Sequence, residues 1–300
     1  MMKRTFDRTL GEKIYLVIGS MIMVLFAAVC IYPILLVIGS SFTEELALIR
    51  NGYNIIPVKF SLFAYKIILA GNSAMVQAYF ISVIVTVLGT AASVAAGVMI
   101  AYAISRRDFR LRGFFNLYVV FTLLFNAGLV PWYIVNVTIW HLKNTLAALI
   151  LPNMVNSFNI LLLCNFMKTI PEELIESARI DGASEFRIAA AIVVPIAMPA
   201  IATIGLFYAM NYWNDWWLAL MYIDNAPQLY PIQYLLRTIV TNAQYLTQNS
   251  STMAMMGAIT LPTEGVKMAA CVLAIGPLII VYPFMQRFFV RGLTLGAIKG

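Results

Sequence analysis

Two stretches of polar residues stand out in an otherwise apolar chain. The first covers residues 168–187, where five of the 13 acidic and three of the 20 basic residues lie within 20 positions. The second covers residues 211–217 and reads Asn-Tyr-Trp-Asn-Asp-Trp-Trp. A loop that concentrates charge suits the recognition of a soluble protein, whereas flat aromatics beside amides and a carboxylate suit the recognition of a sugar. Both stretches therefore predict binding.

The motifs of catalysis and metal binding are missing from the sequence. The single histidine, His141, stands beside Lys143 without an HExxH pattern, so no metal site is expected. Cys30, Cys164 and Cys271 each lie alone in an apolar run, which indicates small buried side chains. No GxxxxGK[ST] loop is present to hold nucleotide phosphates. We predict no catalytic residue, no metal and no cofactor in this chain.

The composition indicates a membrane protein. The chain is 62% hydrophobic and 11% charged, with a mean hydropathy of +0.86, whereas soluble domains carry about 25% charged residues. The net charge of +7 is explained by Lys and Arg in cytoplasmic loops, so no nucleic-acid partner is expected.

The apolar runs predict how the chain crosses the bilayer. Because a crossing helix needs about 20 apolar residues, we predict an all-α protein with six transmembrane helices, at 14–40, 76–105, 114–136, 144–167, 190–222 and 266–289. The first run is too long for a cleaved signal peptide. With the N-terminus inside, the inner segments hold 14 Lys and Arg and the outer segments six, which places both termini in the cytoplasm.

The same pattern divides the chain into a cytoplasmic N-terminus at 1–13 and a transmembrane domain at 14–300. The long outer loop at 223–265 is expected to contain some helix that dips toward a translocation path, with a plain exposed connection as the alternative. The small-residue run at 89–97 predicts a surface for close helix packing.

The charged stretch has the signals of a helix, a turn and a second helix. Pro171 suits a first helical turn, and Gly182 allows a left-handed or tightly packed turn. Ser184 can cap a second helix. That helix should continue to Pro195 and Pro199, where a bend is expected.

The spacing in this stretch resembles the EAA loop of ABC importer permeases. That loop reads Glu-Ala-Ala, three residues, Gly, nine residues and Ile-x-Leu-Pro; the chain has Glu176, Ser177, Ala178, Gly182, Ile192, Val194 and Pro195. Ser177 and Val194 depart from the pattern and are similar in size to the usual residues. Residues 125–131, 229–235 and 282–300 are similar to the shorter permease subunit of maltose-type transporters, in the branch for complex oligosaccharides.

The resemblance implies a type I ABC importer permease fold in a bacterial cell membrane, with residues 168–195 as a coupling loop that docks on a soluble ATPase. Its implied partners are a second, homologous permease in a heterodimer, two ATP-binding subunits that carry ATP and Mg, and an extracytoplasmic solute-binding protein that delivers a sugar or oligosaccharide. The tail at 291–300 is a second candidate ATPase contact. The implied coupling residues are Glu176, Ser177, Ala178, Asp181, Gly182 and Ala183. Of these, Glu176 would be the charged contact, Ala178 and Gly182 the close-packing positions, and Asp181 a cap or rim contact.

The second polar stretch supplies candidate substrate contacts, namely Asn211, Trp213, Asn214 and Asp215. Asp215 is the one acidic residue deep in a predicted span, and such residues are usually functional. An aromatic belt at the outer face of the lipid bilayer and packing between subunits are the alternatives. A secondary carrier would need more ionisable residues within its spans, and an intramembrane enzyme would need a catalytic cluster, so both classes are disfavoured.

Overall fold

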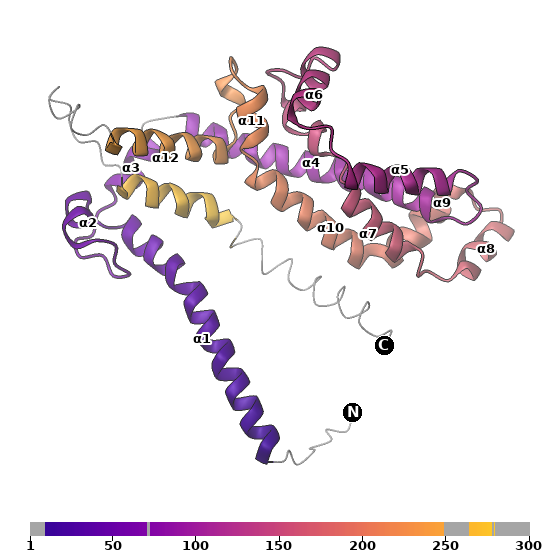
Figure 1. Ribbon diagram of the computed structural model, residues 1–300, viewed down its shortest axis with the longest axis horizontal. Coiled ribbons are helices and arrows are strands. Elements are labelled where there is room, and N and C mark those ends of the chain that lie inside the picture. Colours follow the sequence, from indigo (N-terminus) through magenta and orange to yellow (C-terminus); the bar gives the residue numbers. More distant parts are fainter. Residues whose placement is uncertain (1–9, 71–72, 249–263, 278, 280–300) are drawn as a thin grey trace. The chain divides into compact units, whose positions relative to one another are not determined.

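The computed structural model describes residues 10–70, 73–248, 264–277 and 279. Within these ranges the regular structure is helical, apart from a single isolated β-bridge between Thr43 and Phe60. The chain divides into two compact units, Met1–Gly71 with Asn242–Leu273 and Asn72–Thr241 with Ala274–Gly300, and each is considered by itself (Figure 1). The predicted all-α class is confirmed.

The first unit combines a long apolar helix with short helices. Its helices are α1 (Leu10–Ser41), α2 (Glu45–Asn51) and α3 (Phe63–Ala70), together with helical residues from 264 onward. The Glu45 carboxylate accepts the backbone N–H groups of Glu264, at 2.9 Å, and Gly265, at 2.8 Å. A carboxylate at the first turn satisfies N–H groups that lack partners within a helix. Glu45 therefore joins the start of α2 to the helix at 264.

Two long helices form the centre of the second unit. α4 (Ser73–Ser105) packs along α10 (Val194–Asn214), and α7 (Ser157–Met167) packs against both. Gly89 on α4 faces the ring of Tyr212 on α10 so closely that an added Cβ would lie 2.8–2.9 Å from three ring atoms. The hydroxyl groups of Ser93 and Tyr212 share a hydrogen bond of 2.9 Å. The predicted packing role of the small residues at 89–97 is confirmed.

The third and fourth predicted spans are interrupted. α5 (Arg112–Leu124) is followed by α6 (Leu129–Ile134) and the π-helical η1 (Val135–Ile139) after a bend of 114°. The short 3₁₀ turns η2 (Leu146–Leu149) and η3 (Leu151–Asn153) meet α7 at a bend of 52°. Gly128, with φ of +86°, precedes α6; a backbone in this region favours glycine. The breaks therefore follow from local residues inside apolar runs.

Three described helices are long and apolar enough to cross a membrane, or five crossings if each bent pair counts as one. The three are Ile14–Ser41, Ala74–Ser105 and Glu185–Asn214. The count of six spans and the cytoplasmic position of the termini stay predictions. Of the sixth predicted span, 266–289, residues 266–277 and 279 are helical, and residues 278 and 280–289 lie outside the described residues, as does the tail at 291–300.

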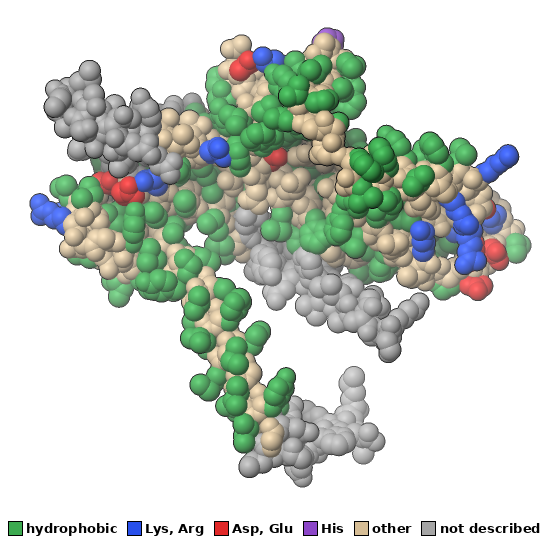
Figure 2. All heavy atoms as spheres, in the orientation of Figure 1, with side chains coloured by type: hydrophobic (Ala, Val, Ile, Leu, Met, Phe, Trp, Pro, Cys, Tyr) green, Lys and Arg blue, Asp and Glu red, His purple; other side chains and the backbone are tan. Residues whose placement is uncertain are grey.

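The predicted fifth span, 190–222, is not one helix, because α10 ends at Asn214. The elements that follow are α11 (Trp217–Tyr222), the 3₁₀ turn η5 (Pro227–Leu229) and α12 (Ile232–Gln248). The helix expected within the outer loop at 223–265 is thus present, while residues 249–263 of that loop lie outside the described ranges. Figure 2 shows hydrophobic side chains over most helix surfaces and a concentration of charged side chains around α8 (Glu172–Ile180) and α9 (Glu185–Ile188).

Candidate functional site

The charged stretch folds as two short helices joined by a tight turn. α8 begins directly after Pro171 and ends in a turn where the N–H of Gly182 donates to the carbonyl of Arg179 and that of Ala183 donates to the carbonyl of Ala178, both at 3.0 Å. This pair of bonds is the Schellman motif, which needs a left-handed residue after the helix. Gly182 supplies it with φ of +80°, so the predicted left-handed turn is confirmed.

The second helix continues into the membrane-spanning core. The Ser184 hydroxyl accepts the N–H of Arg187 at 3.4 Å, as predicted for a cap. α9 then leads through one π-helical turn, η4 (Ala189–Val193), into α10. The wider turn lies just before Pro195, which lacks an N–H group and whose ring would crowd the preceding turn of a regular helix. Despite this wider turn, Glu185–Asn214 forms one continuous apolar helix.

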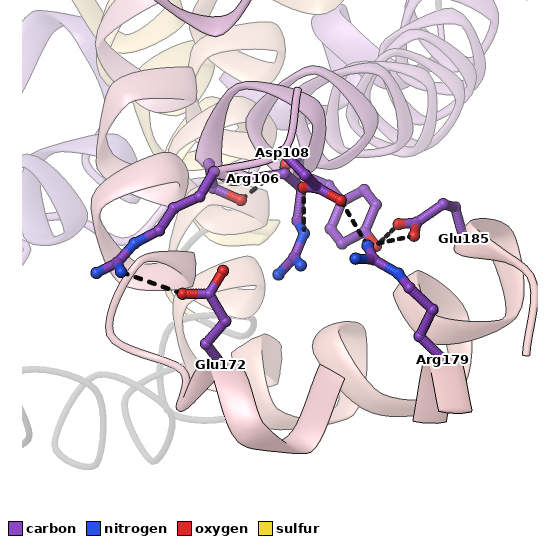
Figure 3. A network of polar contacts seen from close by, with 8 residues as sticks. Arg106, Asp108, Glu172, Arg179 and Glu185 are labelled. Carbon is purple, nitrogen blue, oxygen red and sulfur yellow. Dashed lines mark hydrogen bonds and ion pairs between the residues drawn. The ribbon is translucent and has the colours of Figure 1, made fainter. Parts of the chain in front are cut away.

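A network of charges fixes α8 to the loop between α4 and α5 (Figure 3). The Arg179 guanidinium lies 2.6 Å from the carboxylate of Asp108 in that loop and 2.6 Å from the carboxylate of Glu185 on α9. The Tyr102 hydroxyl on α4 donates to the other oxygen of Glu185 at 2.6 Å. We call Tyr102, Asp108, Arg179 and Glu185 the latch. It joins α8 to α4, to the α4–α5 loop and to the start of α9.

Two further ion pairs lie beside the latch. Arg107 lies 3.3 Å from Glu172 in the first turn of α8. Arg106, whose side chain is nearly buried, lies 3.7 Å from Asp108, a distance too long for a hydrogen bond. Four elements of the second unit are therefore held together by opposite charges at one place.

The charges of the latch shift the pKa values of its members. Partial burial acts to raise the pKa of Asp108, but hydrogen bonds from its own backbone and from Arg179, with the attraction of Arg179 and Arg106, lower it overall. Hydrogen bonds to Glu185 and then to Asp108 raise the pKa of Arg179. Both shifts favour the charged forms, so the Arg179–Asp108 pair is ionised at neutral pH.

One face of α8 points away from the rest of the chain. Glu173, Glu176, Ser177 and Ile180 recur at helical spacing and are all exposed; we call them the outward face. Ile180 is 86% exposed, and Phe186 on α9 is 81% exposed. Large apolar side chains that stand exposed among charged residues often mark a contact with another protein.

The predicted coupling residues divide between the two sides of this loop. Glu176, Ser177, Asp181 and Gly182 are exposed, whereas Ala178 and Ala183 are half-buried and pack against the chain's own core. An added Cβ on Gly182 would meet open space, so its backbone angle is what calls for glycine within this chain. Contact of these residues with an ATPase stays a prediction.

The sequence reasoning missed the residues that hold the loop in place. The basic residues at 106–112 predict only that this loop lies on the inner side of the membrane. Asp108 is the one carboxylate among them, and that contrast was the available signal. Its pairing with Arg179, 71 residues later, could be seen only in the fold.

At the far end of α10, Asp215 has a structural role. One carboxylate oxygen accepts the side-chain amide of Asn153 at 3.0 Å, and the other accepts the backbone N–H of Leu218 at 2.8 Å. Asp215 therefore lies in the break between α10 and α11, where it caps α11 and binds η3. The expectation that it lies deep within a continuous span is wrong, because α10 ends at the preceding residue.

The other predicted substrate contacts also divide into two groups. Trp213 is only 6% exposed, and its indole N–H donates to the carbonyl of Ala274 at 3.2 Å. Asn211 and Asn214 are exposed on the last turn of α10. The Asn214 amide also donates to the carbonyl of Met210 at 2.8 Å, so three of the four candidates bond within the chain, while Asn211 and Asn214 are the two that stay exposed. Within the described ranges no group of three His, Cys, Asp or Glu side chains could hold a metal ion.

Comparison with known proteins gives the class of this chain. Residues 93–295 match the family described as binding-protein-dependent transport system inner membrane component, and the chain belongs to that family. It is therefore a permease subunit of an ABC importer in a bacterial cell membrane and not an enzyme, since ATP is hydrolysed on a separate subunit of such importers.

Individual relatives agree with this class along nearly the whole chain. The polygalacturonan/rhamnogalacturonan transport system permease protein YtcP of Bacillus subtilis is 40% identical over 285 residues, which cover 95% of this chain and 97% of the relative. Protein LplC of the same organism is 35% identical over 296 residues, or 99% and 98% of the two chains. A solved bacterial ABC transporter involved in the import of the acidic polysaccharide alginate matches with a TM-score of 0.82 and 29% identity, covering 95% of this chain and 100% of that one.

Proposed function

We propose that this chain and a second, homologous permease form the translocation path for an acidic oligosaccharide. An extracytoplasmic solute-binding protein delivers the substrate, and two ATP-binding subunits, which carry ATP and Mg, drive its movement. The substrate class is supported by two similar transporters, one named for polygalacturonan and rhamnogalacturonan and one described as importing alginate. These polymers share uronate units, whose carboxylates distinguish them from neutral sugars.

The observation that supports the proposed coupling role is the geometry of the charged loop. The outward face offers Glu176 and the exposed Ile180 to a soluble partner. On a neighbouring face of α8, Arg179 binds carboxylates on two other elements. Movement of an ATPase against α8 would therefore reach α4, α5 and α9 together. Exposed ion pairs add little to overall stability, so the latch matters chiefly because it fixes the relative positions of these elements.

The helix that begins at Glu185 is long enough to transmit this movement across the membrane. Glu185–Asn214 contains 30 residues in one continuous helix, which is about 45 Å at the usual helical rise. This length covers the hydrocarbon core and headgroups of a bilayer. A displacement of the coupling loop is in this way transmitted to Asp215 and the elements around it.

The first test reverses the charge of Glu176. In the reconstituted importer, Glu176→Lys should still insert and pair with the second permease, but it should lose co-purification of the ATPase and ATP-driven uptake. Asn225→Lys, which places a lysine at an exposed position beyond α11, is the control and should keep both. Uptake by Glu176→Lys that continues without any ATPase would contradict the proposed function.

A second test separates ATPase binding from force transmission. Arg179→Gln removes the central charge of the latch and leaves the outward face intact, so the ATPase should still bind while less substrate enters per ATP hydrolysed. The control is Arg187→Gln, since Arg187 is exposed and forms no ion pair with any described residue. Equal transport per ATP in the two variants would remove the latch from the mechanism.

A further inference from the structure

An arginine is stacked on a tryptophan near the end of α10 that is far from the coupling loop. The guanidinium carbon of Arg237, on α12, lies 3.3 Å from the ring centroid of Trp216 in the break between α10 and α11. Trp216 in turn meets Trp217 edge to face, with ring centroids 5.4 Å apart. The Arg237 side chain is exposed and Trp216 is half-buried. The indole therefore holds a positive charge in a defined place at the surface.

The stacking leaves the guanidinium able to bind an anion. A guanidinium that lies flat on an aromatic ring keeps the N–H groups along its edge free, and these match a carboxylate with two parallel hydrogen bonds. No described residue forms an ion pair with Arg237, and the neighbouring carboxylate of Asp215 already accepts two other donors. Among the other basic residues of the predicted outer segments, Lys59, Lys143 and Lys267 are each paired with a carboxylate. Arg50 and Lys66 form no ion pair with a described residue, but neither is stacked on a tryptophan as Arg237 is.

Polar side chains suited to a sugar lie on the same elements. Asn211 and Asn214 are exposed on the last turn of α10, two to five residues before Trp216. The Asn214 amide donates one N–H to the carbonyl of Met210 at 2.8 Å, which holds the amide in place. Gln233 precedes Arg237 by four residues on α12, so the two lie on one face of that helix. A uronate unit presents hydroxyl groups that amides recognise and a carboxylate that an arginine recognises.

We infer that Arg237, held by Trp216, forms with Asn214 and Gln233 a subsite for the carboxylate of an acidic sugar, and that it selects acidic over neutral oligosaccharides. This inference rests on the proposed function and assigns part of its substrate recognition to this permease chain. The sequence offered Asn211, Trp213, Asn214 and Asp215 as substrate contacts, and the structure ties Trp213 and Asp215 to other elements of the chain. Those two side chains are engaged within the chain, whereas the guanidinium edge of Arg237 is free of any described carboxylate.

The test compares an acid with its neutral ester in the complete importer. Trigalacturonate and its methyl ester are supplied with the same binding protein to vesicles that contain the wild type, Arg237→Gln, Arg237→Lys or Arg50→Gln. The preference of the binding protein cancels when the ratio of acid to ester uptake is compared between variants. Arg50 is the control because it is exposed on α2, with no aromatic stacking among the described residues.

The ratio should fall about tenfold in Arg237→Gln, the size expected when one charge-assisted contact is lost. It should fall less in Arg237→Lys, which keeps the charge but loses the flat fork, and it should not change in Arg50→Gln. Co-purification of the subunits shows that each variant has assembled. A ratio in Arg237→Gln equal to that of the wild type, or an equal loss of both substrates, overturns the subsite.

Two further comparisons separate the remaining explanations. If the effect of Arg237→Gln appears only in vesicles with phosphatidylglycerol and not in pure phosphatidylcholine, a lipid headgroup is the ligand and the inference fails. A wild type that takes up no trigalacturonate refutes the proposed substrate class together with the subsite. A wild type that takes it up with an unchanged ratio in the variants refutes the subsite alone.

Discussion

The substitution Gly89→Ala should loosen the contact between α4 and α10. The added Cβ would lie 2.8–2.9 Å from three atoms of the Tyr212 ring, whereas carbon atoms prefer about 3.5–4.0 Å. The ring would have to retreat by roughly 0.6–1.2 Å to reach that distance. Tyr212 is only 2% exposed, and its hydroxyl is bonded to Ser93 and to the carbonyl of Ile150, both at 2.9 Å.

Three contributions set the expected change in the free energy of unfolding for Gly89→Ala. Overpacking of a close contact costs about 1–3 kcal/mol, and displacement of the ring sacrifices a hydrogen bond worth about 1 kcal/mol. Alanine is more favourable than glycine within a helix, which offsets up to about 1 kcal/mol of this loss of stability. The net loss of stability for Gly89→Ala should therefore be about 2 kcal/mol.

The same helix supplies the control. At Gly97 an added Cβ would lie 3.7 Å from a methyl group of Leu163, an ordinary contact, so Gly97→Ala should be neutral or slightly stabilising. Reversible unfolding in mixed micelles, followed by tryptophan fluorescence, measures both variants. In a double-mutant cycle Tyr212→Phe should cost about 1 kcal/mol less when Gly89→Ala is already present. Equal stability of the two alanine variants would refute the close packing.

Three other perturbations test local features. Gly182→Ala should destabilise the turn after α8 by about 1–2 kcal/mol because of its left-handed backbone, and this loss should appear as faster hydrogen exchange in the turn. The control is Gly113→Ala, at an uncrowded helical position, which should leave hydrogen exchange unchanged. Similar hydrogen exchange in the two variants would contradict the left-handed turn. Since the pKa of Asp108 is lowered below its ordinary 3.8, its bond to Arg179 stabilises the chain above that value and is lost as pH falls through the folded pKa. The difference in thermal midpoint between the wild type and Asp108→Asn should thus be fully present at pH 7 and shrink as the pH falls below 3.8, whereas a difference independent of pH would argue against it. Asp215→Ala leaves two donors unpaired and should cost about 1–3 kcal/mol by unfolding, and a neutral result would show that the cap is dispensable.

Features that depend on composition or on neighbouring residues could be predicted from the sequence. The apolar composition identified a helical membrane protein, because a backbone in lipid must satisfy its hydrogen bonds within each segment. The left-handed turn at Gly182 and the cap at Ser184 depend on neighbours within five residues, so they too could be read from the chain. The spacing from Glu176 to Pro195 pointed to the importer permeases, and the family match confirmed this.

The course of the spans could be predicted only in outline. The apolar runs at 114–136 and 144–167 are long enough to cross a membrane, but hydropathy does not register a turn when the residues in it remain apolar. Gly128 precedes α6, and η3 contains Pro152, inside such runs. The resulting bends of 114° and 52° therefore had no counterpart in the composition.

The sequence by itself determined the class of the protein and the helix–turn–helix shape of the charged loop. The tertiary structure decided which distant side chains meet. Asp108 meets Arg179 across 71 residues and Asp215 meets Asn153 across 62, while Arg237 comes to lie on Trp216. Such contacts depend on how whole helices pack, since a residue pattern fixes the face of a helix but not the element that the face will touch.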